Sequence, residues 1–503
     1  MNQNTAASRN SLIFGTGQRI FTAPAALAPI QPDEHVSMPL ADIFHAALFG
    51  MSGHGKSRSL VSTATMLLHR GIGFTLLDPS GDTARLLLQT LISLGFYDHH
   101  PAPFERLIYL DLPAAFRQGY YPAFNILKTG FDAHSSADMV AEAFSRVFPS
   151  SESMTTIASL LKAGAYVLAV HQLPLFPFLY YLLTNVDYRT RLLEAIPDDL
   201  IRQFFLQNTS TRTGQLHLGA EATLKRLFLL MFTLALRYSL GQSDNPIFDY
   251  RSVIGKQQSI IINLNLPDLD AMRFWGALIV VSAEAGARAR GEIDPAHRTG
   301  THCILVDEYH NFVNQSATGF AHMLQEARKW GLFCFLCTQS PGATPESLRT
   351  ALENIDILIA YRLARPGAAA LLSRFGFPID PFLVKEYGHT SIRYFSTAEQ
   401  EDLYLQALTK LGKREAFIRL PGNTVYKMRA LTVPDPIVPL RKLAEIEASY
   451  LQRYFRPQQQ VEQAIASQLA ILQPAQQEAS VPEPVAGVTK PTTAEVLDDI
   501  LRD

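Results

Sequence analysis

The sequence predicts an α/β protein built around a mostly parallel, doubly wound central sheet, and three observations lead to this fold class. Seven short apolar runs show little polar alternation, as expected of parallel strands that are buried on both faces. Helical patterns separate most of these runs, in the rhythm of βαβ units. A glycine-rich loop directly follows the first run. The runs cover residues 46–49, 74–78, 107–110, 259–264, 303–307, 333–338 and 357–361.

Composition sets broad limits on the class of protein. The chain has 503 residues, 47% hydrophobic and 18% charged, which is enough to build two or three domains. A net charge of -2 gives no sign of a surface that coats nucleic acid, so any DNA contact must be local. Three cysteines argue against a secreted disulfide framework and for a reducing cytosol. Apolar stretches are shorter than the roughly 20 residues of a bilayer span, so we expect a cytoplasmic protein, at most peripheral to a membrane.

The first strand leads into a phosphate-binding pattern. Residues 49–57 read F-G-M-S-G-H-G-K-S and complete the pattern G-x-x-x-x-G-K-[ST]. Glycines let successive N–H groups turn toward phosphate oxygens, and the helix predicted over 58–69 points its positive end at them. Lys56 would neutralise the β- and γ-phosphates, and Ser57 would ligate Mg²⁺. The alternative is a chance glycine-rich turn. The predicted nucleotide-binding residues are Gly50, Met51, Ser52, Gly53, His54, Gly55, Lys56, Ser57 and Arg58.

The rhythm of strands and helices is interrupted in the middle of the chain and changes again at its end. Between residues 133 and 242 helix follows helix, which predicts an all-α domain inserted after the third strand. One amphipathic helix is expected near 439–454. From residue 457 the chain is rich in Gln, Ala and Pro, which should not bury enough apolar surface to become ordered. Thr492 and Glu495 have capping-box spacing, which indicates either a helix that docks on a protein partner or a frayed terminus.

Adjacent carboxylates, Asp307 and Glu308, end the apolar strand at 303–307. A triphosphate site needs such a pair, with Asp307 holding the Mg²⁺ shell and Glu308 orienting and polarising the attacking water. The alternative is an acidic start of a helix. The phosphate loop in the same chain favours the catalytic interpretation.

The strand at 333–338 ends in Thr338 and Gln339. Because the carboxyl ends of parallel strands face the ligand crevice, these residues would approach the γ-phosphate. Gln339 can sense a phosphate by hydrogen bonding, or it can simply form a turn. Cys334 and Cys337 lie within this strand, where a period of two places them on opposite faces, so we expect no metal or redox chemistry from them.

The order of these motifs resembles that of the HerA–FtsK superfamily. The loop at 50–57 is followed by L-L-D-P-S-G-D at 76–82, Y-L-D at 109–111, F-N-I-L at 124–127, V-D-E at 306–308, E-A-R-K-W-G at 326–331 and T-Q at 338–339. Over roughly residues 40 to 440 the chain is most similar to the VirD4/TraG/TraD coupling-protein ATPases of conjugation. No motif beyond the first is decisive, and it is their order and spacing that carry the resemblance.

The resemblance implies a RecA-like P-loop motor with an inserted all-α domain. It also implies a homo-hexameric ring that uses ATP and Mg²⁺ to pump DNA through a central pore. The implied organisation is an N-terminal segment (1–40), the first part of the motor (41–132), the all-α domain (133–242), the second part of the motor (243–440), a C-terminal helix (441–456) and a disordered tail (457–503).

Residue roles follow from the same resemblance. Lys56 and Ser57 match the Walker A motif, Asp307 and Glu308 the Walker B motif, and Gln339 the sensor. A further residue, Arg328, lies eleven positions before Gln339, where the family places an arginine that reaches the nucleotide of the neighbouring subunit. Such an arginine can be worth ~10³ to 10⁵ in rate. The alternative for Arg328 is a solvent-facing helix residue.

The chain also departs from the family pattern. Secretion-coupled members usually carry transmembrane helices before the motor, whereas only about forty residues precede it here, so we do not expect stable membrane embedding. These residues are also too few for the β-barrel that begins HerA. Ser80 replaces the lysine of the family's D-P-K-G-D motif, and Asp78 is interpreted as a turn and cap residue. Two alternatives stay open beside an ATP-driven DNA translocase. One is an ATPase adaptor that recruits protein or nucleoprotein cargo through the all-α domain and the tail, without translocating DNA. The other is a nucleotide switch that hardly hydrolyses ATP.

Overall fold

The fold was obtained as a computed structural model, which describes residues 11–31, 34–40, 45–148, 154–209, 220–244, 247–292, 300–313, 323–339, 341, 352, 355–431 and 433–471. These residues form an 11-stranded sheet with the spatial order β2-β1-β14-β13-β10-β3-β9-β8-β4-β7-β5. The strands from β10 to β5 are parallel to one another. The fold class predicted from the sequence is confirmed: this is an α/β protein with a mostly parallel central sheet and an inserted helical region.

The seven predicted apolar runs all form parallel strands. Every residue of β3, β4, β7 and β9 is buried, which explains why these runs lack polar alternation. The parallel strands are β10 (Ile357–Ala360), β3 (Ala46–Phe49), β9 (Leu332–Thr338), β8 (His302–Val306), β4 (Gly73–Asp78), β7 (Ser259–Asn263) and β5 (Leu107–Asp111).

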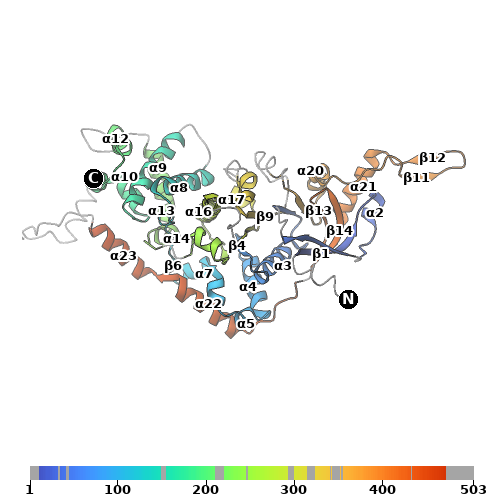
Figure 1. Cartoon of the computed structure of the whole chain (residues 1–503), viewed down its shortest axis with the longest axis horizontal. Coiled ribbons are helices and arrows are strands. Elements are labelled where there is room, and N and C mark those ends of the chain that lie inside the picture. The colour runs from blue at the N-terminus through green and yellow to red at the C-terminus, as the bar shows by residue number, and fades with distance from the viewer. Residues whose placement is uncertain are drawn as a thin grey trace, which may run out of the picture.

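An antiparallel edge extends the sheet beyond β10. It is formed by the hairpin of β13 (Glu415–Leu420) and β14 (Thr424–Ala430) together with β1 (Ser11–Arg19) and β2 (Glu34–Pro39). Strands β1 and β2, which fall within the predicted N-terminal segment (1–40), therefore continue the same sheet. A second hairpin, β11 (Val384–Tyr387) and β12 (Ile392–Tyr394), projects from this end of the molecule (Figure 1).

Helices cover both faces of the sheet. One face buries apolar side chains of α3 (Lys56–His69), α4 (Asp82–Ser93) and α22 (Leu440–Tyr454). The other face packs against a continuous core that includes α15 (Tyr250–Gly255) and α16 (Leu269–Arg288). Cys334 belongs to the second core and Cys337 to the first, so the two thiols lie on opposite faces of β9, as predicted. Shorter elements are α2 (Ala23–Leu27), α5 (Phe96–His99), α6 (Pro103–Arg106), α7 (Leu112–Arg117), η2 (Ala289–Glu292), α17 (His310–Val313), η4 (Ala327–Trp330), α20 (Arg365–Phe375) and α21 (Thr397–Lys410).

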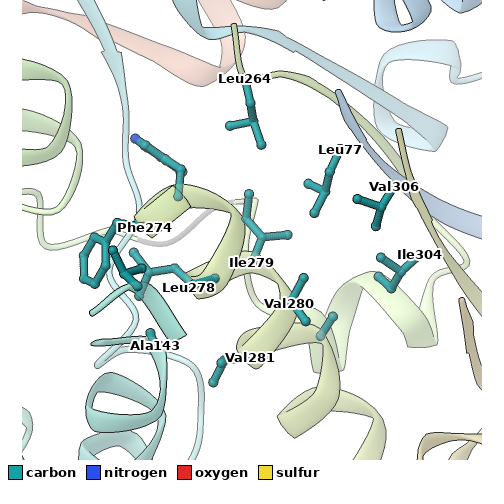
Figure 2. Close-up of a cluster of buried hydrophobic side chains, with 14 of the residues drawn as sticks. Leu77, Ala143, Leu264, Phe274, Leu278, Ile279, Val280, Val281, Ile304 and Val306 are labelled. Atoms are coloured by element: carbon teal, nitrogen blue, oxygen red, sulfur yellow. The ribbon is translucent and has the colours of Figure 1, made fainter. Parts of the chain in front are cut away.

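Helix α16 joins the sheet to the helical domain, by which we mean α8 to α14. Asp268 caps the helix by accepting hydrogen bonds from the backbone N–H groups of Asp270 and Ala271. Figure 2 shows Ile279 and Val280 facing strand residues such as Leu77, while the opposite side of the helix faces Ala143 of α8. The domain comprises α8 (Ala133–Val147), α9 (Met154–Val170), α10 (Phe178–Thr184), α11 (Val186–Glu194), α12 (Asp199–Gln207), α13 (Ala220–Phe232) and α14 (Leu234–Ser239).

The end of the described chain forms a strap across both parts of the molecule. It consists of α22, β15 (Phe455–Pro457) and α23 (Gln458–Ile471), and runs along the lower edge of Figure 1 from the sheet to the helical domain. Strand β15 pairs with β6 (Tyr120–Pro122). The expectation that order ends at residue 457 is therefore wrong for 458–471. The expectation was based on the average composition of the segment, which does not reveal the spacing of its few apolar residues. Val461, Ile465 and Leu469 are spaced four residues apart, so they form one apolar stripe that packs on the core of the helical domain.

The C-terminal segment and the membrane-spanning helices were also considered in the sequence. The terminal segment with Thr492 and Glu495 lies outside the described residues. Within the described ranges, no helix combines the length and the apolar character needed to cross a bilayer.

Candidate active site

The predicted phosphate loop lies between β3 and α3, at the carboxyl edge of the parallel strands. A Cβ on Gly50 would come within 2.5 Å of the Tyr361 Cβ, so only glycine allows the loop to pass this residue. Gly55 has a φ of 123°, a conformation that also favours glycine. Hydrogen bonds from Met51 N to Arg362 O and from Arg414 N to His54 O fix the loop to the neighbouring segments.

The Lys56 side chain folds back into this loop and is only 5% exposed. Its Nζ donates to the carbonyl oxygen of Gly50 at 2.6 Å and lies 3.4 Å from that of Met51. The Glu308 Oε1 lies 4.0 Å from the same Nζ. A buried ammonium is thus held within the loop, where phosphate oxygens can replace the carbonyl partners.

Ser57 and Asp307 meet although they are far apart in sequence. The Ser57 Oγ donates to the Asp307 Oδ2 at 3.0 Å. They meet because β3 and β8 are both neighbours of β9 in a parallel sheet, so the ends of β3 and β8 share one edge. A hydroxyl beside a carboxylate is a set of hard oxygen donors, which suits Mg²⁺. The predicted metal ligands therefore fit the ion in type and in proximity.

Glu308 follows Asp307 in a left-handed backbone conformation, with a φ of 47°. Non-glycine residues rarely adopt it, and such strained residues cluster at active sites. The Oε2 of Glu308 accepts a hydrogen bond from the backbone N of Gln339 at 3.2 Å and lies 3.4 Å from the His310 Nδ1. The structure thus brings the two predicted residues together through the backbone of Gln339, whose side chain is exposed.

Two predicted site residues lie elsewhere. Arg328 belongs to η4, which precedes β9, and so lies at the sheet edge opposite the phosphate loop. Its guanidinium is 3.8 Å from the Asp356 carboxylate, and the side chain is 51% exposed. Arg58 directs its guanidinium to the Val433 carbonyl and the Asp435 carboxylate, where the chain leaves the sheet toward the strap.

The sequence predictions missed two polar neighbours of the carboxylates. Thr83 donates from its Oγ1 to the Asp307 Oδ2 at 2.7 Å. The His310 Nδ1 lies 3.1 Å from the Thr338 Oγ1. Thr83 directly follows the D-P-S-G-D motif, which could have directed attention to it, whereas nothing in the local sequence marks His310.

A cavity of about 370 Å³ lies beside the phosphate loop at Met51. Its volume is within the range of small-molecule sites. A larger cavity of about 740 Å³ lies at the strap, lined by residues such as Tyr120 and Arg456, away from the carboxylates. The smaller cavity is the candidate for a nucleotide-binding cavity, because it adjoins the phosphate loop. Its lining includes Met51, Arg362, Leu363, Arg365, Leu405 and Gln406.

Comparison with known proteins adds a fold relationship. No protein-family model and no curated protein sequence matches the chain. Among solved structures, the unbound conjugative coupling protein TrwBdeltaN70 matches with a TM-score of 0.55 and 16% identity, over 85% of this chain and 96% of that one. The plasmid coupling protein TrwB in complex with ADP and Mg²⁺ matches with a TM-score of 0.54 and 17% identity, over 85% and 96%. TrwB with a non-hydrolysable ATP analogue matches with a TM-score of 0.52 and 16% identity, over 85% and 97%. The resemblance indicated by the sequence motifs is confirmed at the level of the fold: this chain has the P-loop α/β fold of the conjugative coupling protein TrwB.

Proposed function

We propose that the chain is an ATPase that translocates DNA. The observation that carries the ATPase part is the convergence of Lys56, Ser57, Asp307 and Glu308 at the edge of the sheet beside the loop. The nucleotide complexes of TrwB, which has the same fold, support this assignment. The cavity beside Met51 offers room for the nucleoside.

Each residue of this site has a chemical task in the proposed reaction. Lys56 offsets negative charge on the phosphates, and Ser57 and Asp307 hold Mg²⁺, which supplies further charge compensation when bound. Glu308 orients a water for in-line attack on the γ-phosphorus and accepts its proton. The fixed position of the Glu308 carboxylate on the Gln339 backbone N–H favours this role, because an oriented base needs no rearrangement before attack.

The first experiment measures ATP hydrolysis by the wild-type protein and by Lys56→Ala. We expect steady turnover by the wild type and none by the variant, because the ammonium inside the loop is lost. The control is Lys329→Ala, which removes an exposed lysine that pairs with Glu326 on the surface. Hydrolysis at the wild-type rate by Lys56→Ala contradicts the proposal.

Arg328 is proposed to complete the site of a neighbouring subunit in a ring, which we take to be a hexamer. Its place at the opposite edge of the sheet from its own loop agrees with a role in trans. Mixing experiments test this. Lys56→Ala and Arg328→Ala subunits, each inactive alone, should regain hydrolysis when combined, because some interfaces then pair an intact loop with an intact arginine. No recovery from assembled mixtures argues against a trans role.

DNA as the substrate is supported by the fold shared with conjugative coupling proteins. Because the net charge is only -2, contacts with DNA must be local. The test is ATP hydrolysis with and without single- and double-stranded DNA. We expect one of them to raise the rate severalfold. No stimulation by either contradicts DNA translocation and favours an adaptor that recruits protein cargo.

A further inference from the structure

The D-P-S-G-D motif forms a turn between β4 and α4 that has no role in the proposed reaction as described above. The Asp78 side chain, fully buried at the end of β4, organises this turn. It accepts hydrogen bonds from Ser80 N at 2.9 Å, from Ser80 Oγ at 2.7 Å and from Ala84 N at 2.8 Å. Gly81 has a φ of 81°, and a Cβ there would approach the Asn263 Oδ1 to 2.7 Å. The motif therefore fixes where α4 begins.

The residue placed by this turn is Thr83, near the start of α4 and 1% exposed. Its hydroxyl reaches across to β8 and donates to the Asp307 Oδ2 at 2.7 Å. That oxygen is also the acceptor of the Ser57 hydroxyl, at 3.0 Å. The other oxygen, Oδ1, accepts from Glu308 N at 3.1 Å. These three donors orient the Asp307 carboxylate, and the motif determines where one of them, the Thr83 hydroxyl, is placed.

The direction of the Thr83 hydroxyl distinguishes it from Thr90, the other buried threonine of the same helix. The Thr90 hydroxyl donates to the Leu86 carbonyl within α4, a common satisfaction of a helical threonine. Thr83 leaves its own helix and contacts a carboxylate of another strand. Thr83 is the second residue of α4, so the residues three and four before it lie outside the helix, and its hydroxyl is directed at the Asp307 carboxylate instead.

We infer that Thr83 is a positioning residue that holds Asp307 in the orientation needed to bind Mg²⁺ with the nucleotide. This inference rests on the proposed function of the site. Partners that orient metal ligands typically change metal affinity or activity by about 10- to 100-fold when they are removed. Removing the Thr83 hydroxyl takes away one of the donors that hold Oδ2 in place beside Ser57, so we expect the Asp307 carboxylate to be oriented less firmly.

The test compares Thr83→Val with Thr83→Ser and with the matched control Thr90→Val. Binding of a fluorescent methylanthraniloyl derivative of ADP is titrated with Mg²⁺ present and with EDTA. For Thr83→Val we expect about a tenfold loss of affinity with Mg²⁺ and no change with EDTA. Thr83→Ser, which keeps the hydroxyl, should restore most of the loss, and Thr90→Val should bind like the wild type. Thermal melting of the free proteins checks that each variant is folded, and Thr83→Ala replaces Thr83→Val if the valine variant is not.

Two results overturn the inference. One is a folded Thr83→Val protein with the wild-type dependence on Mg²⁺. The other is an equal loss of affinity with Mg²⁺ and with EDTA, which shows a general disturbance of the loop. Failure of the proposed function looks different, because the wild-type protein itself then shows no effect of Mg²⁺ on nucleotide binding and no hydrolysis.

Discussion

Shortening Ile465 to alanine should loosen the end of the strap from the helical domain. The Ile465 side chain is 8% exposed. Its Cδ1 packs against Gly241 so closely that a Cβ on this glycine would lie 2.7 Å from it. The substitution removes three side-chain carbons, each worth about 0.8 kcal/mol when buried. Allowing for the small exposure, we expect a loss of about 2 kcal/mol in the stability of the docked helix, which raises its open population by about 30-fold.

Hydrogen exchange of the backbone amides in α23 measures this opening directly. The expected result is faster exchange in residues 458–471, with little change in the parallel strands, because the helix can open while the sheet stays folded. Gln463→Ala is the matched control, since this side chain is exposed on the same helix. Unchanged protection in Ile465→Ala, or a helix that exchanges freely in the wild type, refutes the docking described above.

Three more predictions concern catalysis, packing and pH. Glu308→Gln should retain nucleotide binding but lower the rate of ATP hydrolysis by about 10²- to 10⁴-fold, because the general base is lost. Steady-state phosphate release measures this rate, and a rate near that of the wild type contradicts the role of Glu308 as the base. Tyr450→Phe removes the hydroxyl that donates to the Leu107 carbonyl at 2.7 Å and should cost about 1–3 kcal/mol, seen as a lower Tm; an unchanged Tm contradicts it. Burial, aided by the charge of Arg328, lowers the pKa of His45 to about 4. Because the unfolded chain then binds more protons between about pH 6.5 and 4, stability should fall as the pH drops through this window. His45→Asn, which keeps an acceptor for the Cys334 N–H, should flatten the fall in Tm, and an equally steep fall contradicts this.

The parallel part of the sheet was predictable because its strands are buried on both faces and carry unbroken apolar sequences. The antiparallel edge was not. Strand β1 contains Gly17, and glycine within a strand makes the sequence pattern of that strand hard to recognise. Glycine is needed at this position because a Cβ would lie 2.2 Å from the Lys427 carbonyl oxygen of the neighbouring strand. No local pattern reports such an approach between residues at opposite ends of the chain.

The candidate active site also contains residues that could be predicted from the sequence and a contact that could not. Lys56, Ser57, Asp307 and Glu308 were found because motif residues at strand ends converge in any parallel sheet. The hydrogen bond between Thr83 and Asp307 depends on how α4 is placed against β8, which the D-P-S-G-D turn decides in three dimensions. The catalytic roles of Gln339 and Arg328 stay proposals, and the second requires a neighbouring copy.

The pairing of β15 with β6 in the strap affects when this part of the fold can form during synthesis on the ribosome. Strand β6 is made early, yet its partner β15 is among the last described segments to be synthesised. At about 5–20 residues per second, translation leaves β6 without this partner for on the order of tens of seconds. The contacts of α23 with the helical domain, around Tyr238 and Gly241, likewise form only after both segments have been made. Docking of β15 and α23 therefore joins the sheet and the helical domain only after both have been synthesised.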